Sequence, residues 1–554
     1  MAKQEKQKSI EESLWDSANK LRGTVESSEY KHVVLGLIFL KFASDKFEER
    51  RAELIAEGKE KYLEMVEFYT MRNVFFLPEE ARWSTIITNA KQADIAIKID
   101  TALFTIEKNN PALKGALPDN YFSRLNMDVS KLAALLDTIN NIDTLRDKQQ
   151  DIVGRVYEYF LSKFALAEGK GKGEFYTPKS IVNLIAELIE PYKGVIYDPA
   201  CGSGGMFVQS IKFIESHHGN KKELSIYGQE YTSTTYKLAK MNLAIRGISA
   251  NLGAVPADTF GRDQHPDLKA DYIMANPPFN QKDWRADNEL IDDPRWRGYE
   301  VPPTGNANYA WILNMVSKLS ENGVAGFILA NGALSGGGDE YKIRQKLIDN
   351  KLVEAILVMP RNLFYTTDIS VTLWILNKNK KAHTVEVNGE TKQYRNRENE
   401  ILFMDLRQMG EPFEKKFTQF SETDIRNIAG TFHKWQCTDE FNSPDIVETR
   451  HATSLNDIVV DFNETRHATS LRDGAPYENV PEYCYAATID EVRAKDYSLV
   501  PSKYIEFVNR DENVDFDEKM RSLQTEMAGL LRAETQSKQD LLTVFKELGY
   551  EIEL

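Results

Sequence analysis

Residues 198–207 read Asp-Pro-Ala-Cys-Gly-Ser-Gly-Gly-Met-Phe and directly follow a short apolar run at 194–197. Glycines at positions 202, 204 and 205 let the backbone turn tightly and approach a ligand where a Cβ atom would clash. Strand-to-helix loops of this kind hold nucleotide-like cofactors in α/β folds. Phe207 replaces the third small residue of the dinucleotide fingerprint, and no G-x-x-x-x-G-K-[ST] loop occurs. The sequence therefore predicts a nucleotide-like ligand but disfavours NAD and ATP.

Short runs rich in β-branched and aromatic residues alternate with helical stretches after about residue 174. The runs are at 194–197, 224–227, 272–275, 324–329, 352–358 and 371–376. This alternation is typical of an α/β fold with a largely parallel sheet. Apolar residues between position 9 and about position 150 instead recur at helical spacing, and the Gly/Lys segment 168–173 marks the boundary.

We therefore expect four regions. They are an N-terminal helical domain at 1–150, a catalytic α/β domain at 151–435, an irregular connecting region at 436–510 and a C-terminal helix at 511–554. The octapeptide ETRHATSL occurs twice in the connecting region, at 448–455 and 464–471, which we interpret as a local duplication without assigned function. The last helix carries a broken coiled-coil seam, for docking on a partner or on its own domain, at Leu523, Met527, Leu530, Leu541, Val544 and Leu548.

The net charge limits how the chain can bind a polyanion. It has 69 basic and 84 acidic residues, a balance of −15, so nucleic-acid binding requires a local basic surface or a partner. Only three cysteines occur, none in a Cys-x-x-Cys pair, which excludes disulfide scaffolds and zinc ribbons, and we expect no metal. The longest purely apolar run, 33–40, is far below the ~20 residues that span a bilayer, so we expect a cytoplasmic protein without membrane contact.

A carboxylate ends the second predicted strand, in Ile226-Tyr-Gly-Gln-Glu230. Alone, such a residue is more often a solvated cap than a ligand. Glu230 lies one strand–helix–strand step after Asp198, which is where α/β folds place an acid that accepts hydrogen bonds from ribose hydroxyls. We therefore interpret Glu230 as a ribose ligand.

The apolar run 272–275 is followed by Asn276-Pro-Pro-Phe279. Two prolines remove two backbone donors, so the loop offers acceptors, and an exocyclic amino group of a base supplies two N–H donors. The side-chain oxygen of Asn276 and the carbonyl of Pro277 are suited to accept both, which makes the nitrogen lone pair available to attack a methyl group. Phe279 is suited to stack on an extruded base. In isolation, the tetrapeptide is more typical of a Pro-Pro loop that ends a strand.

Together the two motifs resemble those of S-adenosylmethionine-dependent DNA methyltransferases that act on amino groups. The surrounding sequence is similar to the modification subunits of type I restriction-modification systems, the HsdM family, over roughly residues 10–380. The segments that carry this resemblance are LWDSANKLRGTVESSEYKHVVLGLIFLKF, GEFYTPKSIV, DPACGSGGMF, YGQE, NPPFN and NANYAWI. The resemblance implies a Rossmann-like methyltransferase core between an N-terminal helical domain and a C-terminal helical, coiled-coil tail.

The resemblance also implies roles for matching residues. Asn276, Pro277, Pro278 and Phe279 match the catalytic tetrapeptide of the family. The expected cofactor-binding residues are Glu174, Phe175, Tyr176, Thr177, Pro178 and Lys179, then Asp198, Ser203, Gly204 and Gly205, with Glu230 at the ribose and Asp258 near the cofactor adenine.

The resemblance implies an adenine-N6 DNA methyltransferase that uses S-adenosyl-L-methionine. Its implied partners are double-stranded DNA, one specificity subunit per two modification subunits, and a restriction/translocase subunit. Cytosine-N4 or glutamine-amide methylation, and a non-catalytic DNA clamp or assembly scaffold, stay open as alternatives. Methylation at cytosine C5 is disfavoured, because it needs a cysteine nucleophile and the family motif Pro-Cys is absent.

Arginine and tryptophan cluster between the catalytic tetrapeptide and residue 306. This composition suits phosphate contact and base stacking, or else tryptophans that anchor an ordered loop. The residues are Trp284, Arg285, Arg295, Trp296 and Arg297.

Overall fold

A computed structural model describes residues 27–125, 127–142, 158–164, 176–217, 219–364, 369–387, 390–413, 416–438, 476–508 and 516–547, with the single residues 12, 15, 16, 19 and 156. The chain divides into two compact units, Met1–Ile505 and Glu506–Leu554. Both copies of the ETRHATSL octapeptide lie outside the described residues.

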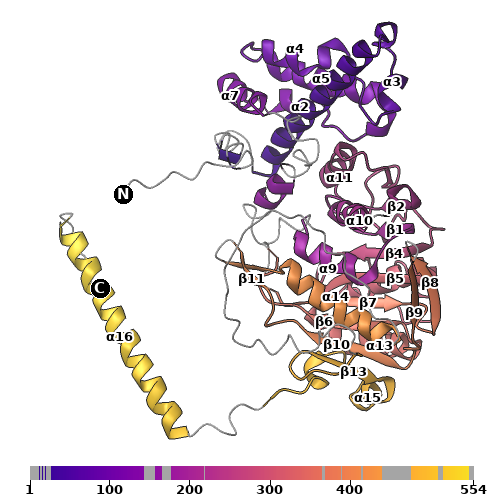
Figure 1. Cartoon of the computed structure of the whole chain (residues 1–554), viewed down its shortest axis with the longest axis vertical. Helices are drawn as coiled ribbons and strands as arrows, with labels where there is room; N and C mark the ends of the chain where they lie inside the picture. The colour runs from indigo at the N-terminus through magenta and orange to yellow at the C-terminus, as the bar shows by residue number, and fades with distance from the viewer. Residues whose placement is uncertain are drawn as a thin grey trace. The chain divides into compact units, whose positions relative to one another are not determined.

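The first part of the larger unit is helical, as the apolar spacing predicts (Figure 1). Its core gathers buried side chains from the long helix α2, and Leu238, Met241 and Ile245 of α11 join the same core. The helical region therefore packs on one helix of the sheet-containing part. The helices are α2 (Ser27–Ala56), α3 (Glu67–Thr70), α4 (Trp83–Thr88), α5 (Ile95–Asn109), α6 (Tyr121–Arg124) and α7 (Val129–Asn140).

A nine-stranded sheet forms the centre of the same unit, in the order β13-β10-β6-β7-β5-β4-β1-β2-β3. Neighbouring strands from β5 to β3 are parallel, as are β6 and β10, which confirms the expected α/β fold. The strands are β1 (Gly194–Asp198), β2 (Leu224–Gly228), β3 (Ala250–Asn251), β4 (Ala270–Ala275), β5 (Leu319–Ala330), β6 (Val353–Val358), β7 (Val371–Asn377), β10 (Glu400–Asp405) and β13 (Cys484–Thr488).

Strand β7 lies between β5 and β6 and is antiparallel to both. Every residue of β6 and β7 is buried, because both faces of the sheet are covered by helices. Along β7, Leu373 and Ile375 contribute to one hydrophobic core, while Trp374 and Leu376 contribute to the other. Alternate residues thus pack on opposite faces of the sheet.

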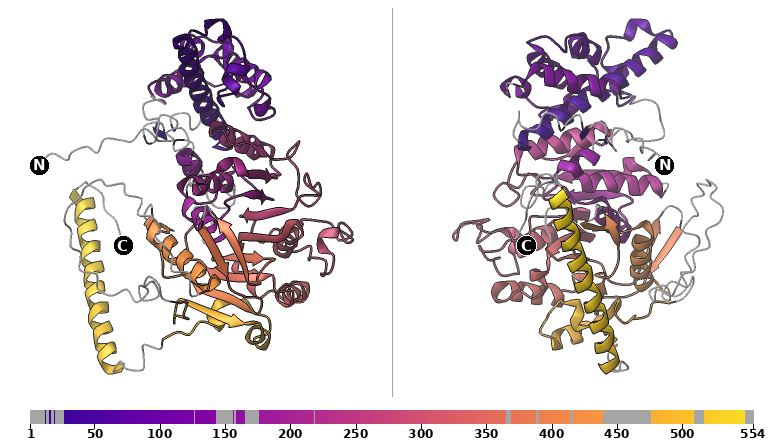
Figure 2. Two further views of the ribbon diagram at one scale, coloured as in Figure 1. Left: turned by 45° about the vertical axis from the view of Figure 1, so that its right-hand side comes forward. Right: turned by 90° about the vertical axis from the view of Figure 1, so that its left-hand side faces the viewer.

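Helices cover the two faces in separate layers (Figure 2). One core contains side chains of α9 (Lys179–Ile189), α10 (Gly205–Ser216), α11 (Ser233–Ile245) and α14 (Glu422–Gln436). The opposite core contains side chains of α12 (Asn308–Lys318), α13 (Gly338–Asp349) and α15 (Ile489–Ala494). The result is a three-layer α/β/α arrangement around the sheet.

The region expected to be an irregular connection at 436–510 contains regular structure. Strand β13 pairs antiparallel with β10, and α15 follows it directly. The expectation of irregularity does not hold for residues 484–494, since the strand is stabilised by pairing with a partner about 80 positions earlier in the chain.

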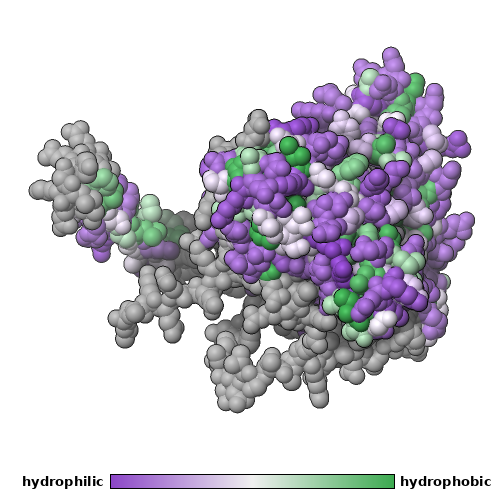
Figure 3. All heavy atoms as spheres, turned by 90° about the horizontal axis from the view of Figure 1, so that it is seen from above, coloured by the Kyte–Doolittle hydropathy of each residue, from purple (hydrophilic) through white to green (hydrophobic). Residues whose placement is uncertain are grey.

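Two short antiparallel ribbons complete the larger unit, β8 (His383–Val387) with β9 (Glu390–Tyr394), and β11 (Glu411–Phe413) with β12 (Phe417–Gln419). Hydrophilic side chains predominate on the described surface seen in Figure 3. In the part of the chain that the structure describes, no helix is both long and apolar enough to cross a membrane.

The smaller unit contains one long helix, α16 (Phe516–Glu547). Large apolar side chains along it are exposed, with Met527 at 58% and Leu530 at 62%. The predicted C-terminal helix therefore exists, and Leu523, Met527, Leu530 and Leu541 of its seam are exposed within its own unit.

Candidate active site

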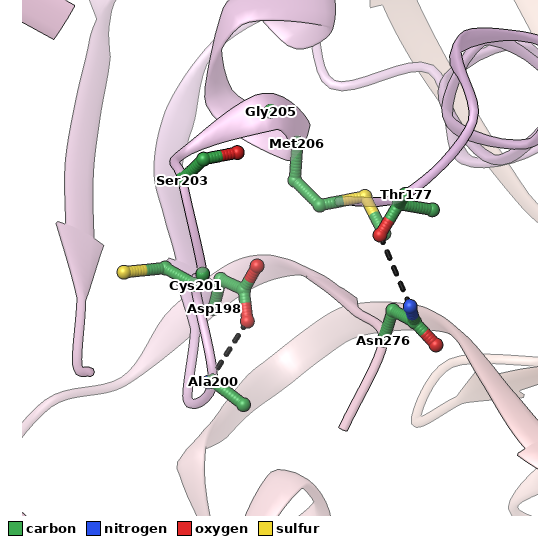
Figure 4. Close-up of a pocket in the computed structure, with 9 residues that line it drawn as sticks. Thr177, Asp198, Ala200, Cys201, Ser203, Gly205, Met206 and Asn276 are labelled. Atoms are coloured by element: carbon green, nitrogen blue, oxygen red, sulfur yellow. Dashed lines mark hydrogen bonds between the residues drawn. The ribbon is translucent and has the colours of Figure 1, made fainter. Parts of the chain in front are cut away.

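The two sequence motifs meet at one edge of the sheet. Strands β1 and β4 are parallel neighbours, with Ile196 opposite Tyr272 and Tyr197 opposite Ile273. Their carboxyl ends therefore carry Asp198 and the Asn276 loop to the same side. A small pocket opens between them (Figure 4), and it is lined by Thr177, Asp198, Ala200, Cys201, Gly202, Ser203, Gly205, Met206 and Asn276.

The glycine loop begins helix α10 through a left-handed turn. Gly204 has φ +77° and donates its backbone N–H to the carbonyl of Cys201 at 2.8 Å. A Cβ atom at Gly204 would lie 3.4 Å from Leu243, whereas one at Gly205 would meet no protein atom within 4 Å. Gly205 lines the pocket, so the space beside it is available to a ligand. The loop therefore allows a ligand to approach its backbone closely, as the glycines predict.

Asp198 ends β1 and is almost completely buried. One carboxylate oxygen accepts a hydrogen bond from the backbone N–H of Ala200 at 2.9 Å. Burial raises the pKa of Asp198 to about 8, opposed by the Ala200 hydrogen bond and reinforced by the nearby charge of Glu230. Burial therefore favours the uncharged form of Asp198 in the free site, and this form can both donate and accept a hydrogen bond.

Glu230 follows β2 and contacts the glycine loop directly. Its carboxylate accepts hydrogen bonds from the backbone N–H groups of Gly202 at 3.1 Å and Thr232 at 2.8 Å. Burial raises the pKa of Glu230, against the effect of these amides. The carboxylate is thus fixed beside the loop, and its remaining lone pairs are suited to ribose hydroxyls.

Gln229 is a residue whose role the sequence did not reveal. It is completely buried and its side-chain amide donates to the carbonyls of Ala257 and Arg262, while its side-chain oxygen accepts from the backbone N–H of Gln264. Its backbone also bonds to Asp198 and Cys201. Gln229 therefore joins the glycine loop to the loop at 257–264.

Asp258 lies on that loop, and neither it nor Glu230 lines the pocket described above. Its carboxylate oxygens accept from the backbone N–H groups of Phe260 at 3.3 Å and Gly261 at 2.8 Å. These hydrogen bonds hold the turn at 258–261. The contact of Asp258 with the adenine of a cofactor stays a prediction.

In the tetrapeptide Asn276–Phe279, Asn276 is the residue that lines the pocket with the glycine loop. Its side-chain nitrogen Nδ2 donates to Oγ1 of Thr177 at 3.1 Å (Figure 4). Its oxygen Oδ1 is buried and has no hydrogen-bond partner within the described part of the chain. A donor from a bound ligand could satisfy this acceptor. Pro277 is buried and Pro278 is half-buried.

Phe279 is half-buried and packs edge-on against Phe364, with ring centroids 5.6 Å apart. The next residue, Asn280, has φ +50° and exchanges two hydrogen bonds with the buried side chain of Asn308, at 3.1 and 2.9 Å. The amide pair therefore anchors the end of the loop 276–280 to the start of α12. The NANYAWI segment contains Asn308, but the sequence alone gave no reason to pair it with Asn280.

The segment predicted to fold over the cofactor is only partly described, since Glu174 and Phe175 lie outside the described residues. Thr177 lines the pocket, Tyr176 is half-buried, Pro178 is buried just before α9, and Lys179 is exposed at the first position of that helix. Of the predicted cofactor residues, the pocket gathers Thr177, Asp198, Ser203 and Gly205, and it adds Met206, which the sequence did not single out.

The arginine and tryptophan residues after the catalytic loop mostly stabilise their own loop. Trp284 and Trp296 are 7% and 2% exposed, and Arg295 pairs with Asp293 and donates to the carbonyls of Thr259 and Phe260. Arg285 donates to four backbone carbonyls. The loop-anchor interpretation is therefore right for these residues, while Arg297 is exposed. Within the described residues no group of three or more metal-ligating side chains is found.

Comparisons with known proteins agree with this geometry. The sequence matches the N-6 DNA Methylase family over residues 148–513 and the HsdM N-terminal domain over residues 10–142. The HindI methylase subunit of a type I restriction enzyme from Haemophilus influenzae is 39% identical over 86% of this chain and 100% of that protein. The MjaIX methylase subunit from Methanocaldococcus jannaschii is 33% identical over 98% of this chain and 92% of that protein.

The fold is shared with a solved structure. The type I restriction-modification system methyltransferase subunit from Streptococcus thermophilus gives a TM-score of 0.68 at 20% identity, covering 90% of this chain and 99% of that chain. The three-layer fold, with both motifs at one sheet edge, defines the class of α/β methyltransferases. Within that class the chain belongs to the N-6 DNA methylase family, and it groups there with the methylase subunits of type I restriction enzymes. The family expected from the motifs is confirmed.

Proposed function

We propose that this chain transfers the methyl group of S-adenosyl-L-methionine to the N6 amino group of an adenine that is flipped out of DNA. The observation that carries the proposal is the shared pocket, which the glycine loop and Asn276 line together. The glycine loop allows a ligand to approach the backbone closely, and Asn276 contributes an amide whose oxygen Oδ1 has no partner within the described residues.

The residues present fit the proposed cofactor. Open space beside Gly205 admits a ligand close to the backbone, and the carboxylates of Asp198 and Glu230 lie at the ends of adjacent strands. S-adenosyl-L-methionine supplies an activated methyl group when bound. We expect Asp198, Ser203, Gly204, Gly205 and Glu230 to hold it, with Asp258 and the segment 174–179 at its two ends.

The catalytic loop acts on the amino group that receives the methyl. Asn276 Oδ1 and the carbonyl of Pro277 accept its two N–H bonds, which draws the lone pair of the nitrogen out of conjugation with the ring and directs it toward the methyl group. Phe279 stacks on the extruded base, and its contact with Phe364 fixes its ring. No covalent intermediate with the chain is needed.

Other amino groups offer the same donors, so cytosine N4 and a glutamine amide are the alternative substrates. Membership of the N-6 DNA methylase family favours adenine. A non-catalytic clamp is disfavoured because the pocket and the unpartnered acceptor are both retained.

The chain is proposed to act in a complex, as the modification subunit. Double-stranded DNA, a specificity subunit shared by two copies of this chain, and a restriction/translocase subunit are the proposed partners. The acidic net charge of −15 supports delegated DNA recognition, and the exposed seam of α16 supports docking on a partner helix. We also propose the divisions at residues 150 and 510.

The test is methyl transfer from radiolabelled cofactor by the complex of this chain with its specificity subunit, followed by digestion of the DNA to nucleosides. We expect labelled N6-methyldeoxyadenosine, and a loss of roughly 100-fold or more in kcat for Asn276→Ala with cofactor binding retained. Labelled N4-methyldeoxycytidine, labelled protein, or no transfer contradicts the proposal. Unaltered turnover by the variant removes Asn276 from the mechanism.

A further inference from the structure

The loop that carries the tetrapeptide Asn276–Phe279 is held at both of its ends. One end continues β4, whose last residue Ala275 pairs with Phe327 of β5. The other end is Asn280, which adopts the left-handed φ of +50° and is bonded to Asn308 at the first position of α12. Only four residues lie between these anchors, and two of them are prolines with a fixed φ. A loop this short and stiff follows the positions of its two ends.

Backbone N–H groups set the rotation of the amides at the second anchor. The N–H of Asn280 can only donate, and it donates to Oδ1 of Asn308 at 3.1 Å. Nδ2 of Asn308 therefore occupies the other end of its amide and donates to Oδ1 of Asn280 at 2.9 Å. In the same way, the N–H of Asn308 donates to Oδ1 of Asn306 at 2.9 Å, which leaves Nδ2 of Asn306 to donate to Oδ1 of Asn280 at 3.3 Å. The oxygen of Asn280 thus accepts from two amides whose rotation is fixed.

The next residue, Gln281, is tied to the same turn of α12. Its carbonyl accepts from the backbone N–H of Ala307 at 2.9 Å, and its side-chain oxygen accepts from Nε1 of Trp311 at 3.3 Å. Ala307, Asn308 and Trp311 are all buried, so this turn is part of the core on that face of the sheet. The turn is therefore a rigid support for the end of the loop.

We propose that Asn308 is a positioning residue for methyl transfer: its amide fixes Asn280, and through Asn280 it aligns the carbonyl of Pro277 and the ring of Phe279 with the target base. This inference rests on the proposed function, because it assigns the support of the tetrapeptide that acts there. Neither Asn280 nor Asn308 lines the pocket in which we expect the cofactor. Loss of this anchor should therefore lower kcat and leave cofactor affinity unaltered.

Three variants separate the hydrogen bonds from the backbone conformation, all in the full chain in complex with its specificity subunit. Asn280→Gly keeps the left-handed φ and the backbone N–H but removes the side-chain acceptor. Asn280→Asp keeps the acceptor, and its charge stays in water because residue 280 is exposed. Asn308→Leu keeps the approximate size of the side chain and removes both of its hydrogen bonds.

Asn110→Leu is the matched control for lost stability. Asn110 is 2% exposed, against 1% for Asn308, and it also forms paired hydrogen bonds. Its amide accepts from the backbone N–H of Phe76 and donates to the carbonyl of the same residue, both at 2.9 Å. Asn110 follows α5 in the helical region, whereas Asn308 begins α12 beside the loop.

Three quantities are measured: kcat at saturating cofactor and DNA, the dissociation constant of S-adenosyl-L-methionine by calorimetry, and Tm. We expect Asn280→Gly and Asn308→Leu each to lower kcat roughly 10- to 100-fold, the size of effect seen when reacting groups are slightly misplaced. Their cofactor dissociation constants should match that of the wild type, and Asn280→Asp should keep most of the kcat. Asn110→Leu should lower Tm as Asn308→Leu does, because both leave a buried backbone N–H without its partner, but should keep the wild-type kcat.

The double variant Asn280→Gly/Asn308→Leu tests whether the two residues act as one anchor. If they do, the double variant is no slower than the slower single variant, because the same contact is removed in each. Losses in kcat that multiply would show that the two residues act independently, which contradicts the inference.

A wild-type kcat for Asn280→Gly or Asn308→Leu overturns the inference, and so does an Asn280→Asp variant as slow as Asn280→Gly. Equal slowing by Asn110→Leu would assign the effect to lost stability instead. If Asn308→Leu does not fold, the comparison of Asn280→Gly with Asn280→Asp decides alone. Failure of the proposed function is read separately, from the wild-type complex: if it transfers no methyl group to adenine, the reaction that Asn308 is proposed to support is absent and the inference fails with it.

Discussion

Asp198 shows how burial at the end of a strand prepares the pocket. The pKa of its carboxyl is raised to about 8 because the group is removed from water and lies near Glu230. In an unfolded chain an aspartate titrates near pH ~3.9. Between those two values the folded protein binds the proton that the unfolded chain has already released.

That difference predicts a pH dependence of stability. Since the folded state holds the extra proton, the contribution of Asp198 to the free energy of unfolding falls as pH rises from about 4 to about 8. Asp198→Asn does not titrate, so its stability relative to the wild type should increase over this interval and level off above it. Chemical unfolding at pH 5, 6.5 and 8 measures the difference. Parallel profiles for the two proteins would show that Asp198 is ionised in the folded state.

Several residue roles depend on contacts that no local pattern reveals. Gln229 and Asn308 lie in segments whose resemblance to the family is clear, yet their hydrogen bonds reach residues 28 or more positions away. The arginine and tryptophan residues at 284–297 have the composition of a nucleic-acid surface. Their partners are backbone carbonyls and a buried aromatic cluster, which only the folded loop brings together.

At the scale of the element, the start of α10 contains two glycines with different roles. Gly204 adopts φ +77°, a conformation that costs a residue with a Cβ atom about 1–2 kcal/mol, whereas Gly205 is helical and open on its pocket side. We therefore expect Gly204→Ala to lower the free energy of unfolding by about that amount. Gly205→Ala should keep the stability but weaken cofactor binding, because its methyl group enters the pocket.

For both variants, chemical unfolding measures the free energy of unfolding, and calorimetric titration with S-adenosyl-L-methionine measures the cofactor affinity. If Gly205→Ala binds the cofactor like the wild type, the backbone of α10 is not close to the ligand. If Gly204→Ala is as stable as the wild type, the left-handed turn is not required.

Strand positions were largely predictable and sheet order was not. All six apolar runs correspond to strands, because the strands of a sheet that is covered by helices are rich in apolar residues. The antiparallel insertion of β7 and the addition of β13 to the sheet edge follow from pairing between distant segments. The segment 484–488, Cys-Tyr-Ala-Ala-Thr, is short and contains two alanines, which have low strand propensity, so its pairing with β10 left little signal in the local sequence.

For the whole molecule, the exposed seam of α16 is the feature that we connect to assembly. Leu523 and Leu530 are 47% and 62% exposed, and large apolar groups at coiled-coil spacing are normally covered by a partner. Replacing both by glutamate should weaken binding to the specificity subunit by roughly 100-fold or more, as expected when two apolar anchors are lost. The Tm of the isolated chain should not change.

Thr525→Glu with Gln536→Glu is the matched control, because it adds the same charge on another face of the helix, where both residues are also exposed. Co-purification and calorimetry compare the two double variants. Equal binding by both would show that the seam of α16 does not contact the partner.

The central claim is that the glycine loop and Asn276 serve one reaction in one pocket. An experimental structure of the complex with DNA and sinefungin, an unreactive analogue of S-adenosyl-L-methionine, measures this most directly. We expect the analogue beside Gly205, a flipped adenine whose N6 lies roughly 3–3.5 Å from the transferring position, and an N6–H donated to Oδ1 of Asn276. An analogue bound outside this pocket, or an Asn276 oxygen bonded to another group, would contradict the claim.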